Sequence, residues 1–280
     1  MLRSLFVALK SGTEYLNYGR HIIQQWGAEL FGAAPPSEAF RVLDLGCGPG
    51  TDLLNVRKSV REKHGSGSAI ELYGIESYGP NVEKCTREGI RTFPADIERD
   101  PYPVEDAAMD VVIANQVLEH TKEVFWIFAE VARLLKPGGH FIVGVPNLAS
   151  LHNRLLLLFG QQPTQIQTLS AHVRGFTKPD MRRFAEEGGF FRLVQFRGSN
   201  FYPLPPFLSK PLSRLFPTLA WGSFYLLERT SRTEGSFLEC LSGDSNFLET
   251  PFFGGPQNPA PARRRSRGRT AGRSKPGKRR

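Results

Sequence analysis

Residues 42–52 read VLDLGCGPGTD, and this stretch decides the fold. An apolar run typical of a buried strand leads directly into a loop with glycine at every second position, at Gly46, Gly48 and Gly50. Such a loop can turn tightly, and a ligand can approach its backbone without meeting a Cβ atom. The stretch predicts a small-molecule site at the carboxyl end of a strand.

The loop differs from the one that binds the pyrophosphate of a dinucleotide. That fingerprint needs its third glycine three positions after the second, where this chain has Thr51. Pro49 further constrains the loop. An NAD-dependent oxidoreductase is therefore the weakest of the functions considered. Taken alone, the glycine loop could also be only a tight connection between a strand and a helix, with no ligand bound.

Short apolar runs alternate with amphipathic stretches after the loop. The runs end in turn residues and predict strands, whereas 122–135 and 178–188 carry apolar residues at helical spacing. The predicted strands, including the one before the loop, are 41–45, 71–75, 91–93, 110–114, 140–145 and 192–196. Strands separated by helices imply crossover connections. The sequence predicts an α/β fold with a mainly parallel sheet and helices on both faces.

Polar side chains follow these strands in a regular order. Glu76 ends the second predicted strand, Asp96 and Ile97 follow the third, and Asn115 ends the fourth. The stretch LLKPGG at 134–139 introduces the fifth. Ligands of open α/β sheets bind outside the carboxyl ends of the strands, so we expect these residues to converge on one crevice. Singly, each acid has an alternative role as a cap or a solvated turn residue.

In this order and spacing the motifs resemble those of the class I S-adenosylmethionine-dependent methyltransferases, in particular the small-molecule group called type 11. The resemblance covers about residues 40–200. It implies a Rossmann-like fold with a seven-stranded, mainly parallel sheet, helices on both faces, and S-adenosyl-L-methionine as cofactor. This cofactor has no phosphate, which agrees with a glycine loop that has no lysine or arginine beside it.

The resemblance also implies the residues that contact the cofactor. Asp44 and the loop would lie along its methionine part, and Glu76 would bind the ribose, with Ser77 beside it. Asp96 would bind the adenine amino group, and Ile97 would pack on the adenine ring. The complete predicted set is Asp44, Gly46, Cys47, Gly48, Gly50, Glu76, Ser77, Asp96, Ile97 and Asn115.

Residues 115–120, NQVLEH, bear on the acceptor. Relatives that methylate exocyclic nucleobase nitrogens carry Asn or Asp followed by Pro-Pro-aromatic at this place, and this chain does not. Ubiquinone-pathway O-methyltransferases carry a similar Leu-Glu-His, preceded by an acid that helps to hold a divalent metal. Gln116 replaces that acid, so no metal is expected. His120 is a candidate general base, with capping or packing of the next helix as its alternative role.

Two later stretches, HVRGFT at 172–177 and EEGGF at 186–190, are similar to segments of type 11 enzymes that act on sugars, lipids or quinones. The stretch PNLASLHNRL at 146–155 also resembles the MetW proteins, in which a methyltransferase-like domain accompanies an acyltransferase. In either family His172 and Arg174 would lie on the substrate side. His172 is the second catalytic candidate, and its alternative role is to anchor a loop.

These observations divide the chain into three parts. Residues 1–39 are predicted to form an N-terminal helical segment that covers the cofactor site, with apolar residues at helical spacing between 13 and 31. Residues 40–230 form the methyltransferase domain, with 223–228 as a final antiparallel strand. The aromatic and proline-rich stretch 201–221 is an insertion before that strand. We expect it to pack in the core, and an acceptor lid or a membrane-surface contact is the alternative. Residues 235–280 are predicted to be a disordered basic tail.

The formal charge of +9 comes from that tail. Residues 260–280 hold ten Arg and Lys and no acid, which leaves 26 basic and 27 acidic side chains in the rest of the chain. The nearly neutral body argues against an obligate nucleic-acid partner, although the tail could bind anionic polymers or lipids. Three widely spaced cysteines and the lack of a long apolar run favour a cytoplasmic protein.

The sequence predicts a methyltransferase that acts on a small molecule, at oxygen, with a lipid-, saccharide- or quinone-like acceptor. Methyl transfer is an in-line displacement that depends on alignment, and a base is needed only where the acceptor must lose a proton. Two alternatives stay open. One is a MetW-like partner of a biosynthetic enzyme, and the other is a methyltransferase that reaches RNA or protein through the basic tail.

Overall fold

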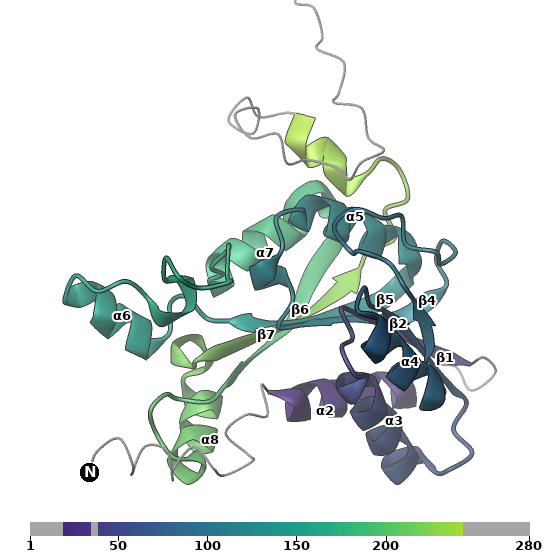
Figure 1. The fold of residues 1–280 in the computed structure, drawn as a ribbon, viewed down its shortest axis with the longest axis horizontal. Coiled ribbons are helices and arrows are strands. Elements are labelled where there is room, and N and C mark those ends of the chain that lie inside the picture. Colours follow the sequence, from purple (N-terminus) through teal and green to yellow (C-terminus); the bar gives the residue numbers. More distant parts are fainter. Residues whose placement is uncertain (1–18, 35–38, 243–280) are drawn as a thin grey trace, which may run out of the picture.

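A computed structural model describes residues 19–34 and 39–242 of the chain. Its seven-stranded sheet has the order β3-β2-β1-β4-β5-β7-β6 (Figure 1). Strand β7 runs antiparallel to both of its neighbours, and the other paired strands are parallel. The strands are β1 Phe40–Leu45, β2 Ile70–Ile75, β3 Arg91–Phe93, β4 Met109–Asn115, β5 Leu135–Pro146, β6 Phe191–Ser199 and β7 Gly222–Arg229.

Helices cover both faces of the sheet. The α-helices are α2 Arg20–Ala33, α3 Thr51–His64, α4 Gly79–Arg87, α5 Val124–Leu134, α6 Leu151–Leu158, α7 Lys178–Glu186 and α8 Pro206–Leu215. All of the predicted strands are present, within a few residues of their expected bounds. The seven-stranded, mainly parallel Rossmann-like sheet with helices on both faces is thereby confirmed. Within the described residues, no helix is both long and apolar enough to cross a membrane.

The alternation of side chains along the strands divides the core in two. In β4, Val111 and Ile113 pack with α2 and α3, whereas Val112 and Ala114 face α5 and α7 on the other side. Successive residues of a strand point to opposite faces, so apolar residues at every position make a strand that is buried on both sides. This is why the strands next to the glycine loop read as continuous apolar runs.

The N-terminal helix lies on the α3 side of the sheet. Ile22, Ile23 and Trp26 of α2 are buried against residues of α3 and the central strands. The described helix begins at Arg20, inside the predicted span. The expectation that residues 1–39 cover the cofactor site stays a prediction, and residues 1–18 and 35–38 of that segment lie outside the described residues.

The predicted start of the basic tail at residue 235 is too early. A short 3-10 turn, Phe237–Ser242, follows β7, and Phe237 is 1% exposed. Its ring lies 5.4 Å from that of Phe128 and 5.3 Å from that of Phe184. One aromatic side chain is enough to fix this segment on the core, and a single residue gives no periodic signal in the sequence. The rest of the predicted tail, 243–280, lies outside the described residues.

The 201–221 insertion does lie between β6 and β7, but it does not pack in the core as expected. Helix α8 buries Ser209 and Ser213, whereas Phe207, Leu215 and Phe216 are exposed. The core-packing prediction is therefore wrong for most of this segment. Phe201 and Ala220 at the two ends of the segment are buried, whereas the buried residues of α8 itself are the small Ser209 and Ser213.

Candidate cofactor and acceptor site

The glycine loop follows β1 and leads into α3. Gly46, Gly48 and Gly50 have φ angles of +60°, +52° and +79°, a left-handed conformation that side chains with a Cβ rarely adopt. A Cβ atom built at Gly48 would have no described atom within 4 Å. At Gly48 the loop therefore presents bare backbone to open space at the carboxyl end of the sheet, whereas Gly46 and Gly50 lie against Val117 and Ile90.

Three carboxyl groups surround this loop. Asp44, Asp52 and Glu76 are only 3%, 7% and 9% exposed. Burial raises the pKa of Asp44 well above its usual range, the charges of Asp52 and Glu76 raise it further, and the Arg20 guanidinium opposes the shift. Buried like charges are costly unless a cation lies among them. The site is thus suited to a positively charged ligand.

Glu76 is held in place by backbone donors. Its Oε2 accepts a hydrogen bond from the Gly48 amide at 2.8 Å, and its Oε1 accepts one from the Tyr78 amide at 2.8 Å. Ser77, beside it, is exposed. The carboxylate therefore joins the end of β2 to the glycine loop, where the sequence places it.

Sequence analysis missed two residues of this cluster, Asp52 and Arg20. Arg20 Nε donates to Asp52 Oδ1 at 3.0 Å, and Asn115 Nδ2 donates to Asp52 Oδ2 at 2.9 Å. The Oδ1 atom of Asn115 is buried without a hydrogen-bond partner among the described residues. An acid in the first turn of the helix that follows the loop was the available signal for Asp52. Nothing local to Arg20 indicates the pairing.

The side chain of Cys47 is buried beside the glycine loop. Its side chain points into the core, where its Sγ lies 3.9 Å from that of Cys85, and a Cβ built at Gly74 would come within 2.6 Å of it. Burial raises the pKa of the Cys47 thiol, so the group stays protonated. Only the backbone of residue 47 can belong to a ligand site in the loop, and the side chain is a packing residue.

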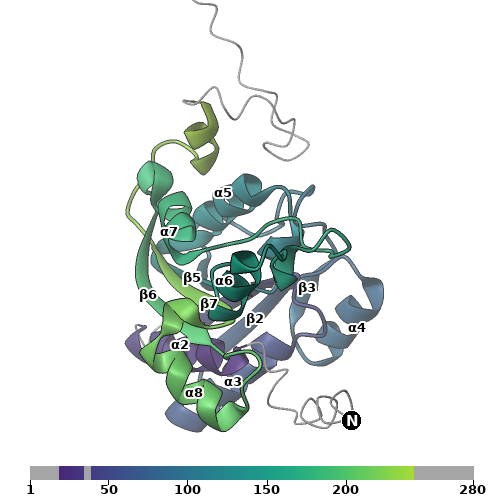
Figure 2. The same cartoon turned by 90° about the vertical axis from the view of Figure 1, so that its left-hand side faces the viewer.

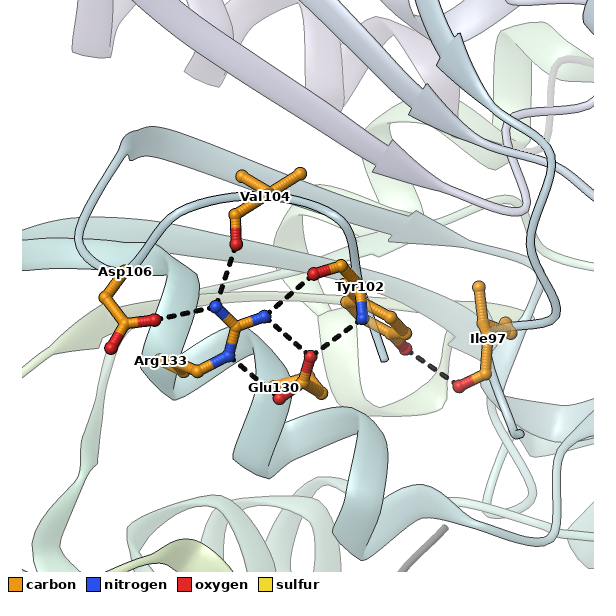
Figure 3. Close-up of polar contacts among 6 residues, drawn as sticks. All are labelled: Ile97, Tyr102, Val104, Asp106, Glu130 and Arg133. Carbon is orange, nitrogen blue, oxygen red and sulfur yellow. Dashed lines mark hydrogen bonds and ion pairs between the residues drawn. The ribbon is translucent and has the colours of Figure 1, made fainter. Parts of the chain in front are cut away.

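Ile97 lies on a loop that is fastened to α5 (Figure 3), and Asp96 precedes it directly in the sequence. Tyr102 donates its hydroxyl hydrogen to the Ile97 carbonyl at 2.9 Å. The Arg133 guanidinium donates to Glu130 and Asp106, each at 2.7 Å at the shortest, and to the Tyr102 and Val104 carbonyls. The Glu130 carboxylate in turn accepts the Tyr102 amide hydrogen. This network fixes the loop where the sequence predicts contacts to adenine.

The candidate acceptor side lies just after β4. Glu119 and His120 form a 3-10 turn with Leu118, and the backbone carbonyl of Glu119 accepts the amide hydrogens of Val173 and Arg174. This docking places the His172 ring 4.6 Å from the His120 ring, edge to face. The structure thus brings together the two histidines that the sequence indicated separately, 52 positions apart.

Backbone carbonyls fix the tautomer of both imidazole rings. His172 Nδ1 lies 2.7 Å from the Gln165 carbonyl oxygen, and His120 Nδ1 lies 3.3 Å from that of Ala171. A carbonyl only accepts, so each Nδ1 carries the hydrogen and Nε2 is the basic nitrogen of the neutral ring. Burial lowers the pKa of His172, the bond to Gln165 opposes the shift, and His120 lowers it further.

Glu119 is an unusual carboxyl group beside these rings. It is 1% exposed, and neither carboxyl oxygen has a hydrogen-bond partner within the described ranges. Burial raises its pKa from 4.5 to about 7. Its Oε1 lies 4.0 Å from His120 Nε2. Near neutral pH the group can therefore hold or release a proton next to the histidine pair.

Two further expectations concern this region. Potential ligand atoms of Glu119, His120 and His172 all lie within 4.8 Å of one another, a spacing that a metal ion can span. The expectation of no metal rested on Gln116, and it stays a prediction. Arg174 does not point freely toward an acceptor, because its guanidinium donates to the Thr121 and Lys122 carbonyls at 3.2 and 2.6 Å. It fastens the His172 loop to the turn after β4.

Comparison with known proteins places the chain in one family. The sequence profile of a methyltransferase domain matches residues 15–193, which is more than half of the chain. The chain belongs to this methyltransferase-domain family, and its sheet has the order and strand directions of the class I methyltransferase fold. Its cofactor is S-adenosyl-L-methionine, and the open glycine backbone among buried carboxyl groups suits that sulfonium cation.

Individual relatives agree with the family. Over 127 residues the chain is 31% identical to 27-O-demethylrifamycin SV methyltransferase of Amycolatopsis mediterranei, covering 44% of this chain and 46% of that protein. Over 175 residues it is 29% identical to a ubiquinone biosynthesis O-methyltransferase of Cupriavidus pinatubonensis, covering 59% and 65%. The chain thus spans less than two thirds of either relative.

Solved structures support the fold. The DszA carbon methyltransferase superposes with a TM-score of 0.57 at 15% identity, covering 81% of this chain and 57% of that one. The CurJ carbon methyltransferase gives 0.53 at 17% identity, covering 76% and 54%. At these identities the likeness concerns the fold alone.

Proposed function

We propose that this methyltransferase acts on an oxygen atom of a small-molecule acceptor of lipid-, saccharide- or quinone-like kind. The observation that carries the proposal is the histidine pair, whose Nε2 atoms are the basic nitrogens of both rings beside the buried Glu119. A hydroxyl acceptor must lose its proton as the new bond forms, and a neutral imidazole is the base best suited to accept it. One of the relatives is named as a ubiquinone biosynthesis O-methyltransferase, and the other is named as a methyltransferase of 27-O-demethylrifamycin SV.

The residues have distinct roles in this proposal. Asp44, Glu76 and the loop backbone bind and orient the cofactor, which supplies an electrophilic methyl group when bound. His172, whose pKa is lowered, is neutral at pH 7 and accepts the acceptor proton at Nε2. His120 contacts the His172 ring, and its Nε2 lies 4.0 Å from Glu119 Oε1, so it can share that proton with the carboxyl group. Arg174 positions the His172 loop and does not take part in proton transfer.

Three variants of the full-length protein test the proposal. Asp44→Asn removes a carboxylate that faces the cofactor, and we expect S-adenosylmethionine affinity to fall about tenfold or more. His172→Gln and His120→Gln should bind the cofactor normally, and at least one should transfer its methyl group about 100-fold more slowly. Calorimetry measures the binding, and transfer of label from the cofactor to a cell extract measures the reaction.

His64→Gln is the matched control, because His64 bonds the Ala28 carbonyl on the α2 and α3 side of the sheet. It should leave both measurements unchanged. Wild-type transfer rates in both histidine variants of the site would exclude the proposed base. Label found on a nitrogen or a carbon atom of the product would exclude oxygen as the acceptor atom.

A further inference from the structure

Exposed apolar side chains gather on two segments. Of the fourteen large hydrophobic side chains exposed in the described part of the chain, twelve lie within 151–173 and 202–216. The most exposed on helical elements are Leu158, Phe159, Phe207 and Leu215, each above 70%. Such large side chains scatter singly over an ordinary surface. Their concentration on two segments requires an explanation.

Helices α6 and α8, which lie in these two segments, bury polar side chains and expose apolar ones. Helix α6 buries Asn153 and exposes Leu155, Leu157 and Leu158. Helix α8, as described above, buries its serines and exposes its aromatic and aliphatic residues. A helix that serves only the fold turns its apolar side inward. The apolar sides of α6 and α8 are therefore free to serve a contact outside the described fold.

The two helices belong to one face of the molecule. Figure 2 shows α6 and α8 together on the side that lies to the left in Figure 1. The segments that carry them are joined, because the His152 ring packs edge to face against the Tyr202 ring with centroids 4.9 Å apart. Asn147 Nδ2 also donates to the Thr218 and Ala220 carbonyls at 2.9 and 2.8 Å. We call α6, Phe159, α8 and Phe216 the apolar face.

The apolar face carries charge of one sign. Its basic residues are Arg154, Lys210 and Arg214, and the sequence has no Asp or Glu within 148–177 or within 197–227. A second copy of the same face would bring like charges together, whereas a surface of anionic lipids complements both the charge and the apolar side chains. Exposed Leu and Phe flanked by cations are typical of helices that lie in a membrane interface.

This face is connected to the acceptor side. The buried side chain of Asn153 in α6 bonds the Gln165 side chain and the Thr164 amide, and the Gln165 carbonyl accepts the Nδ1 hydrogen of His172. We propose that the apolar face docks on the surface of a bilayer that contains anionic lipid, so that the acceptor side opens at the membrane. The proposed lipid- or quinone-like acceptor could then enter from the bilayer, and in that respect the inference deepens the proposed function.

Binding to vesicles tests the docking without any methyl transfer, so failure of the two proposals can be distinguished. The full-length protein is mixed with vesicles of phosphatidylcholine, with or without phosphatidylglycerol, and separated by flotation. The variant Leu158→Ser, Phe159→Ser, Phe207→Ser and Leu215→Ser removes apolar side chains that are already exposed. We expect its partition coefficient on anionic vesicles to fall about tenfold or more.

Val194→Ser is the control, because Val194 is exposed on β6 outside the apolar face. It should bind vesicles as the wild type does. The basic stretch 260–280 is present in every variant, and its electrostatic contribution is screened at about 0.5 M salt. Binding of the wild type that persists at this salt concentration, and that the fourfold variant loses, supports the proposal.

Several results would overturn it. If the fourfold variant binds vesicles as strongly as the wild type does, the binding belongs to the basic stretch 260–280. Another such result is a wild-type protein that binds neither kind of vesicle. If the substitutions convert an oligomer to a monomer in sedimentation, a second copy covers the face. If they lower the thermal unfolding temperature by several degrees, the chain itself covers it.

Discussion

Gly48 shows how a single residue combines a structural and a binding role. Its positive φ needs glycine for the turn, and the open space at its Cβ position is where the sequence predicts the cofactor. The two requirements can be separated by experiment. Backbone strain from a Cβ atom lowers the stability of the folded protein, whereas the volume of that atom obstructs the bound ligand.

Gly48→Ala should therefore cost about 1–2 kcal/mol of stability through the left-handed backbone and also weaken S-adenosylmethionine binding. Gly138 is the matched control, since it has a φ of +80° and open space at its Cβ position but precedes the central part of β5, away from the loop. Gly138→Ala should show the strain alone. Calorimetry and thermal unfolding measure the two effects, and equal cofactor affinity in both variants would contradict the placement of the ligand.

The buried carboxyl group of Glu119 makes the stability of the folded protein depend on pH. Its pKa is about 7 in the folded protein against 4.5 ordinarily, so the folded state holds an extra proton between these values. The contribution of this group to the free energy of unfolding is complete below about pH 4.5. It is lost as the pH rises through about 7, and the free energy of unfolding falls by about 3 kcal/mol.

Glu119→Gln cannot titrate, so the difference in unfolding free energy between wild type and variant isolates this group. We expect the wild type to lose about 3 kcal/mol relative to the variant between pH 4.5 and pH 8. Urea unfolding at several pH values measures it. Parallel pH profiles of the two proteins would show that the carboxyl group has a partner or an ordinary pKa.

At the scale of elements, α5 does more than cover the sheet. Its last turn presents Arg133, which joins Glu130 in the same helix to the loop that carries Asp96 and Ile97 (Figure 3). The bond to Glu130 raises the pKa of Arg133, and the charge of Asp106 adds to the effect. A helix far from the glycine loop in sequence thus holds the loop that the sequence predicts to contact adenine.

Arg133→Met should destabilise the fold by about 2 kcal/mol, because it leaves the buried Glu130 without its main partner. It should also weaken cofactor binding several-fold, because the adenine-side loop loses its anchor. Lys58→Met is the control, since Lys58 forms only an exposed pair with Glu62 and such pairs contribute less than about 1 kcal/mol. An Arg133 variant as stable as the Lys58 variant would rule out this role.

The candidate acceptor site belongs to the scale of the whole molecule, because it combines the turn after β4 with a loop about 50 residues later in the chain. The same three side chains suit either proton transfer or a metal ion. Removal of divalent metals distinguishes these roles.

We expect methyl transfer to be unchanged after treatment with a chelator, because the proposed base needs no metal. The measurement is transfer of labelled methyl groups before and after dialysis against EDTA, with cofactor affinity measured in parallel. Activity that is lost and then restored by a divalent cation would assign the cluster to metal binding and replace the proposed base. The sequence expectation based on Gln116 would then be wrong.

Features that depend on local sequence could be predicted, and features that depend on packing between distant residues could not. The sequence by itself determined the strands, the glycine loop, and the placement of Asp44 and Glu76. Those features depend on local alternation and on backbone conformations that only glycine adopts readily. The same local signals gave Asn115 and the Asp96 loop, because parallel strands end at one edge of the sheet.

Only the tertiary structure decided the remaining features. It paired Arg20 with Asp52, turned Cys47 into the core, and seated Phe237 among the α5 and α7 aromatics. It also joined His120 to His172 and exposed the apolar sides of α6 and α8. Each depends on which distant residues fill the neighbouring space, and a linear pattern does not specify that packing.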